Sequence, residues 1–159
     1  MCIWDLERKI LNSVPLSPDE MRVVEQALVA EEVSETVLAC EALLRLGDER
    51  QRHDAVQVLS RIVKETNSGA LEPTSDLLMA FFSVPEAVLN RPDFQVALKS
   101  AASHTDEGVR GNCMIALGPP AKAGKKWAEE LLKDGLRDSS DHVQQNARAC
   151  LRLVHNVET

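Results

Sequence analysis

The stretch DEGVRGNCMIALG, residues 106–118, decides the fold of this sequence. It begins with an acid, continues with a Val-Arg pair and a run of small and apolar residues, and closes on a glycine. An acid is typical of the start of a helix and a glycine of its end, while the apolar residues recur at helical spacing. The stretch therefore predicts an amphipathic helix.

The same pattern recurs 34 residues further along the chain, where residues 94–118 align without a gap with residues 128–152. Asn112 falls on Asn146, whereas Arg110 falls on Gln144, so the charge of Arg110 is not common to both copies. A looser copy, SETVLACEALLRLG, occupies residues 34–47. Self-similarity at a period of about 20–50 residues indicates stacked repeat units. Apolar residues coincide in the pairs Leu98/Leu132, Ala102/Leu136, Val109/Val143, Cys113/Ala147, Ala116/Cys150 and Leu117/Leu151.

Helical periodicity extends over most of the chain, and strand alternation is almost absent. We expect helices over 3–14, 17–32, 34–47, 49–69, 91–104, 106–118, 125–138 and 140–154, and a short helix within 72–88 that Pro85 interrupts. The segment GPPAKAGKK, residues 118–126, predicts a rigid turn. With three Phe, two Trp and no Tyr, the core is built from aliphatic residues, which suits packed helices. The expected fold class is all-α, with about eight or nine helices.

Residues 92–155 resemble the HEAT-type helical repeat, and residues 34–66 resemble it more loosely. The resemblance implies a short right-handed α-solenoid of antiparallel helix pairs in one domain, residues 1–159. Residues 1–33 would be atypical N-terminal cap helices, and residues 34–155 would form the repeats. In this family the second helices of the pairs line the concave side, which usually receives the partner. The matching residues are Asp106, Val109, Arg110, Cys113, Ala116, Leu117 and Gly118 in a first helix, and Leu131, Leu132, Leu136 and Asp138 in a second.

The formal net charge of −7 is unevenly distributed. Residues 19–49 contain nine acids and two arginines, so this segment alone carries a charge equal to that of the whole chain. An acidic surface attracts basic partners and repels phosphate backbones. We therefore predict a non-catalytic protein-binding module (an adaptor, inhibitor or immunity-type protein) that binds a basic protein. The predicted acidic patch comprises Glu31, Glu32, Glu35, Glu41, Asp48 and Glu49.

A second surface competes with this patch, namely the ridge formed by the second helices. It comprises Gln57, Arg61, Lys64, Gln95, Lys99, Glu130, Lys133 and Arg137. Together with Lys122, Lys125, Lys126 and Trp127, its cations leave nucleic-acid binding or DNA repair as an alternative function. A bilin-lyase-like enzyme, which needs a deep pocket with convergent polar groups, is a second alternative.

Nothing in the sequence points to catalysis, a cofactor or a metal. The spacing of Cys40, Cys113 and Cys150 is close to multiples of the repeat, which predicts buried packing positions. The four histidines lack the spacing of metal ligands, and we expect His104 and His142 in turns beside capping acids. No run of about 20 apolar residues and no signal peptide is visible, so we expect a cytoplasmic protein without a membrane span. Exposed apolar residues near the C-terminal end suggest a monomer or a weak homodimer.

Overall fold

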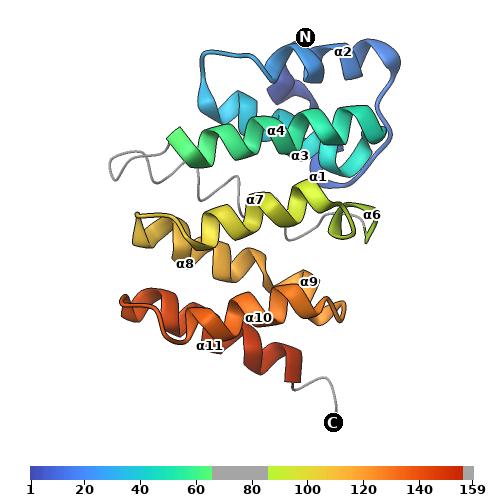
Figure 1. Cartoon of the computed structure of the whole chain (residues 1–159). Coiled ribbons are helices and arrows are strands. Elements are labelled where there is room, and N and C mark those ends of the chain that lie inside the picture. Colours follow the sequence, from blue (N-terminus) through green and yellow to red (C-terminus); the bar gives the residue numbers. More distant parts are fainter. Residues whose placement is uncertain (66–85, 156–159) are drawn as a thin grey trace.

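The computed structural model describes residues 1–65 and 86–155, and every regular element in this part of the chain is a helix. The all-α prediction is confirmed. Figure 1 shows the order of the elements, which are η1 (Ile3–Leu6), α1 (Glu7–Leu11), α2 (Pro18–Ala27), α3 (Val33–Leu46), α4 (Glu49–Glu65), α6 (Glu86–Leu89), α7 (Pro92–Ala102), α8 (Glu107–Ala116), α9 (Gly118–Lys122), α10 (Lys126–Gly135) and α11 (Asp141–His155).

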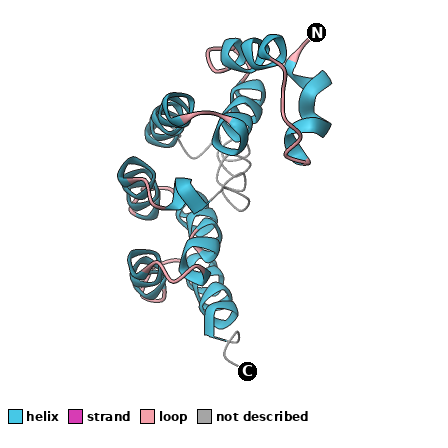
Figure 2. Cartoon of the chain, turned by 90° about the vertical axis from the view of Figure 1, so that its right-hand side faces the viewer, coloured by secondary structure: helices cyan, strands magenta, loops and turns pink. Residues whose placement is uncertain are grey.

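The longer helices form two rows. Figure 2 shows α4, α7 and α10 in one row and α3, α8 and α11 in the other, with η1, α1 and α2 at the N-terminal end. Neighbouring helices pack within the rows, α4 on α7 and α8 on α11, and also between the rows, α3 on α4 and α10 on α11. The aliphatic side chains between the rows form one buried cluster, as the sequence predicted.

Local signals set most helix ends. Ser17 and Glu20 form a capping box at the start of α2, and Pro18 occupies the first helical position. α2 ends at Ala27, five residues before the expected end at residue 32. The segment predicted as a rigid turn contains the short helix α9, because a proline is well accommodated in the first turn of a helix. Most of the short helix expected within 72–88 lies outside the described residues.

The 34-residue offset relates hydrogen bonds as well as residues. The Nη1 of Arg110 donates to the carbonyl oxygen of His104 (2.9 Å), and the Nε2 of Gln144 donates to the carbonyl oxygen of Asp138 (2.7 Å). Both bonds span six residues, and donors and acceptors are each 34 positions apart. Two chemically different side chains therefore close the same helix-preceding loop in successive copies.

The side chain that precedes each of these helices also plays an equivalent part. His104 Nδ1 accepts from the backbone N–H of Asp106 (3.0 Å), and Asp138 Oδ1 accepts from that of Ser140 (2.8 Å). In α8, Asp106 then caps the helix by accepting from Gly108 N and Val109 N. His104 is thus a turn histidine beside a capping acid, as expected.

Cys40, Cys113 and Cys150 are buried, which confirms their prediction as packing positions. Cys113 Sγ donates to the carbonyl oxygen of Leu98 (3.3 Å), and Cys40 Sγ donates to that of Ala55 (3.7 Å). Both thiols therefore face a neighbouring helix.

The outer face of α11 is polar. In α8, the buried residues Gly111 and Met114 lie close to α11 and α10, where His142 and Gly135 approach them. Their counterparts in α11 are Gln145 and Arg148, which are exposed. Although Leu153 is 67% exposed, the face lacks the small and apolar residues that α8 uses for stacking. Polar outer faces are typical of the terminal units of helical repeats.

Candidate binding surfaces

Three of the six predicted acidic-patch residues are engaged within the fold. Glu41 pairs with Arg45 (2.7 Å), and both side chains are largely buried, 13% and 12% exposed. Burial raises the pKa of Glu41, and the neighbouring Arg45 offsets part of this effect. Asp48 and Gln51 cap the start of α4 reciprocally, each accepting from the backbone N–H of the other. Glu49 pairs with a residue of α7. These acids therefore stabilise helices rather than form one open surface.

The other three acids gather at the start of α3. Glu32 is the residue before the helix, and its Oε1 accepts from Ser34 Oγ (2.6 Å). Glu31 is exposed, whereas Glu35 is partly buried in the first turn. Carboxylates here interact favourably with the helix dipole, which accounts for their presence without a partner. What remains of the predicted patch is this shorter group, Glu31, Glu32 and Glu35.

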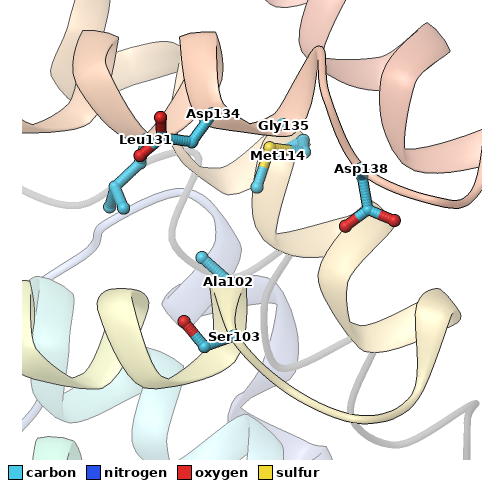
Figure 3. A pocket seen from close by; sticks show the side chains of 7 residues that line it. All are labelled: Ala102, Ser103, Met114, Leu131, Asp134, Gly135 and Asp138. Atoms are coloured by element: carbon cyan, nitrogen blue, oxygen red, sulfur yellow. The ribbon is translucent and has the colours of Figure 1, made fainter.

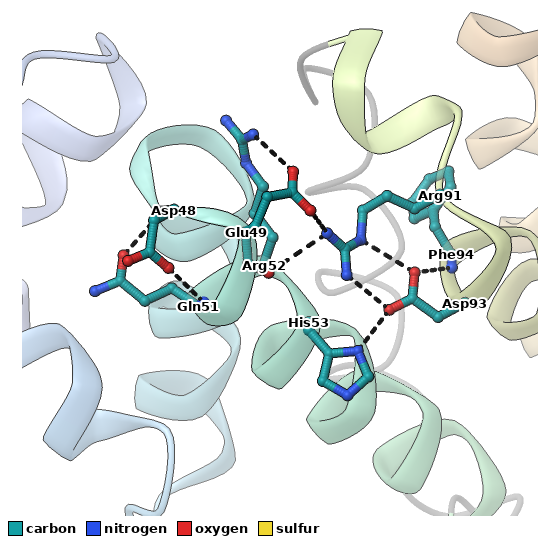
Figure 4. Close-up of polar contacts among 8 residues, drawn as sticks. All are labelled: Asp48, Glu49, Gln51, Arg52, His53, Arg91, Asp93 and Phe94. Carbon is teal, nitrogen blue, oxygen red and sulfur yellow. Dashed lines mark hydrogen bonds and ion pairs between the residues drawn. The ribbon is translucent and has the colours of Figure 1, made fainter.

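An ion-pair network joins the N-terminal ends of α4 and α7, as Figure 4 shows. Arg91 donates to the carboxylate of Glu49 and makes two hydrogen bonds to Asp93, of 3.1 and 3.0 Å. His53 Nδ1 lies 3.0 Å from the same carboxylate of Asp93. Burial tends to raise the pKa of Asp93, but hydrogen bonds from Arg91 and His53 outweigh it, so the pKa is lowered. Sequence reasoning missed this network, because its members lie about 40 residues apart.

The predicted second-helix ridge comes together on α4, α7 and α10. We call this surface the second-helix face, and the three helices run in the same direction across it (Figure 1). Seven of the eight predicted residues are exposed, and Gln95 is partly buried. The members are Gln57, Arg61 and Lys64 on α4, Gln95 and Lys99 on α7, and Glu130 and Lys133 on α10 with Arg137 just after it.

Most cations of the second-helix face have no acidic partner. Lys133 pairs with Glu129 (2.7 Å). In the described part of the chain, no ion pair involves Arg61, Lys64, Lys99 or Arg137, which form a loose row across the three helices. Their position in or just after the C-terminal halves of the helices complements the helix dipoles. The dipoles explain the sign of the charge, but not why these side chains lack counter-ions.

The other predicted basic residues do not form an aromatic platform. Lys125 Nζ donates to Asn90 Oδ1 (2.6 Å), while Lys122 and Lys126 are exposed. Trp127 packs against the core cluster, and its indole nitrogen is buried without a hydrogen-bond partner in the described structure. Because Trp127 is oriented inward, it offers no exposed ring on which a base could stack.

A small pocket of about 120 Å³ lies between the end of α7, α8 and α10 (Figure 3). Asp138 at its edge is held by Arg110 through two hydrogen bonds, of 2.8 and 2.9 Å. Pockets for small-molecule ligands and cofactors are typically about 300–1,000 Å³, so this one is too small for a chromophore. The lining residues are Ala102, Ser103, Met114, Leu131, Asp134, Gly135 and Asp138.

Within residues 1–65 and 86–155, no group of three or more His, Cys, Asp and Glu side chains is arranged to hold a metal ion. None of the helices in the same ranges combines the length and the apolar character that a membrane crossing demands.

Comparison with known proteins finds no matching family model, no matching curated protein and no matching solved structure. The functional argument therefore rests on the geometry of this chain.

Proposed function

We propose that this protein is a non-catalytic protein-binding module, an adaptor, inhibitor or immunity-type protein built as a short HEAT-like solenoid. The partner docks on the second-helix face. The observation that carries this proposal is the row of Arg61, Lys64, Lys99 and Arg137, four cations without ion-pair partners on three stacked helices. Repeat proteins of this kind typically use such extended surfaces for binding.

The distribution of ion pairs supports the choice of face. Glu41, Asp48 and Glu49 have partners within the fold, so their charges are largely compensated. The cations of the second-helix face, apart from Lys133, are not compensated in this way. Uncompensated surface charge of one sign steers and orients a complementary partner.

Site-specific photo-crosslinking tests the proposal. A photoreactive amino acid replaces Val96, which lies on α7 within the second-helix face and is 65% exposed. The matched control places the same group at Gln145, exposed on α11 in the other row. In extract from the source cells, we expect the Val96 variant to give a discrete protein adduct that the Gln145 variant lacks. Equal adducts from both positions, or none from Val96, would refute docking on this face.

The acidic alternative has its own test. Changing Glu31, Glu32 and Glu35 together to Lys reverses what remains of the predicted patch. If a basic partner binds there, the triple variant loses the partner in a pull-down. On the present proposal, the triple variant retains it, whereas Lys99→Glu weakens it.

Nucleic-acid binding is tested on the same cations by a mobility-shift assay with duplex and single-stranded DNA at about 50 mM salt. We expect no shift, because the chain is acidic overall and exposed Glu130 and Asp134 lie among the cations of α10. A salt-sensitive shift that Lys99→Glu abolishes would replace the protein-binding proposal.

A further inference from the structure

The cations of the second-helix face are spaced, not clustered. Arg61, Lys99 and Lys133 lie on three successive helices of one row, and each is exposed. Axes of packed helices are about 8–10 Å apart, so the cationic groups are offered at intervals of about that distance across the row. Acidic residues stand beside them on α10, at Glu130 and Asp134.

We infer that the second-helix face binds an extended, acidic peptide segment of a partner protein, crossing α4, α7 and α10 with a carboxylate at every third residue. This inference rests on the proposed function and specifies the partner. An extended chain rises about 3.3 Å per residue, so three residues span about 10 Å, which matches the helix spacing. Successive carboxylates then meet Arg61, Lys99 and Lys133.

The same spacing disfavours a polyphosphate backbone. Duplex DNA carries one charge per about 1.7 Å of helix axis, far denser than one cation per helix. A continuous row of phosphates would also meet Glu130 and Asp134, whose carboxylates repel it. A peptide avoids both acids, because the residues between its carboxylates can be neutral.

Val96 adds a non-electrostatic contact. Its side chain is 65% exposed on α7, three residues before Lys99 and therefore one helical turn away. An apolar residue of the peptide, next to its central carboxylate, would cover this side chain. The preferred segment is therefore acidic at every third position and aliphatic near its centre.

The test uses the full-length protein and three fluorescent probes in an anisotropy titration at low salt. The first probe is a peptide with glutamate at every third position and a central valine. The second has the same composition with its glutamates in one block, and the third is a short DNA duplex. We expect the spaced peptide to bind about tenfold more tightly than the block peptide, and more tightly than the duplex.

Two charge reversals locate the site. Lys99→Glu should weaken binding of the spaced peptide by about tenfold, because it places a carboxylate against the central carboxylate of the peptide. The matched control Arg148→Glu reverses an exposed cation on α11 and should leave the affinity within about twofold. Circular dichroism and thermal unfolding of both variants verify that each remains folded.

Equal binding of the spaced and block peptides would overturn the inference, since only general attraction between opposite charges would then be at work. Tighter binding of the duplex, or equal effects of the two reversals, would overturn it too. If the peptides fail but the Val96 crosslink still captures a partner, the proposed function stands and the peptide inference is wrong. If both fail, neither stands.

Discussion

Arg110 is the most heavily bonded side chain of the repeat, and its removal has a calculable cost. The guanidinium makes two hydrogen bonds to the carboxylate of Asp138 and donates to the carbonyl oxygens of His104 and Thr105, each at 2.9 Å. Both charged side chains are 14% exposed. Arg110→Ala leaves Asp138 without its counter-ion in a largely buried place. Breaking fully buried pairs costs about 3–5 kcal/mol, so with partial exposure we expect about 3 kcal/mol.

Arg110→Gln separates the two roles of the side chain. Gln144, at the equivalent position of the next copy, bonds to the equivalent carbonyl, so a glutamine at 110 should still reach His104 O. It loses only the ion pair with Asp138, and we expect a cost of about 1.5 kcal/mol, half that of alanine. Urea unfolding followed by circular dichroism measures both variants, with Asp138→Asn and Arg110→Ala/Asp138→Asn completing a double-mutant cycle.

The pH dependence gives a second measurement of the same pair. Hydrogen bonds from Arg110 lower the pKa of Asp138 in the folded protein, against the opposing effect of burial. A lowered folded-state pKa means that the stabilisation is complete above the unfolded value of about 3.9 and is lost as the pH falls through the folded value. The stability gap between wild type and Arg110→Ala should therefore narrow below about pH 4. A gap that persists at lower pH, or an Arg110→Gln variant as unstable as Arg110→Ala, would refute this account.

Three further variants or reagents probe the packing and the ion pairs. Gly135→Ala places a Cβ 2.4 Å from the Sδ of Met114, so thermal unfolding should show a loss of about 1–3 kcal/mol, and wild-type stability would contradict this close contact. Burial raises the pKa of Cys40 to about 12, so iodoacetamide should label exposed Cys2 in the native protein and Cys40 only after unfolding, as mass spectrometry can verify. Arg91→Ala should lower stability by about 1–2 kcal/mol in urea unfolding, because the contact between the N-terminal ends of α4 and α7 is lost; an unchanged midpoint would show that the network contributes nothing.

Much of the secondary structure could be predicted from the sequence. Helical periodicity and capping residues are local properties, so the starts of α7 at Pro92 and of α8 after Asp106 follow from a few neighbouring residues. The early end of α2 at Ala27 was missed, because the acids at 31 and 32 extend the helical pattern without ending it. The burial of Cys113 was foreseen from its place in the repeat.

The candidate site was only partly predictable. The second-helix face was correctly assembled from the repeat, because residues at equivalent positions face the same side of stacked helices. The acidic patch was not, since proximity in sequence says little about proximity in space: Glu41, Asp48 and Glu49 point to three different partners.

The sequence by itself determined that this chain is helical and which residues recur between its units, because both are written in periods of 3.6 and 34 residues. Only the tertiary structure decided which charges are compensated. Glu49 meets Arg91 across 42 residues and Arg110 meets Asp138 across 28, and no local pattern encodes such pairs. Lys99 and Arg137 lack a counter-ion for the same reason, as the stacking of the helices brings no carboxylate into salt-bridge distance of either cation.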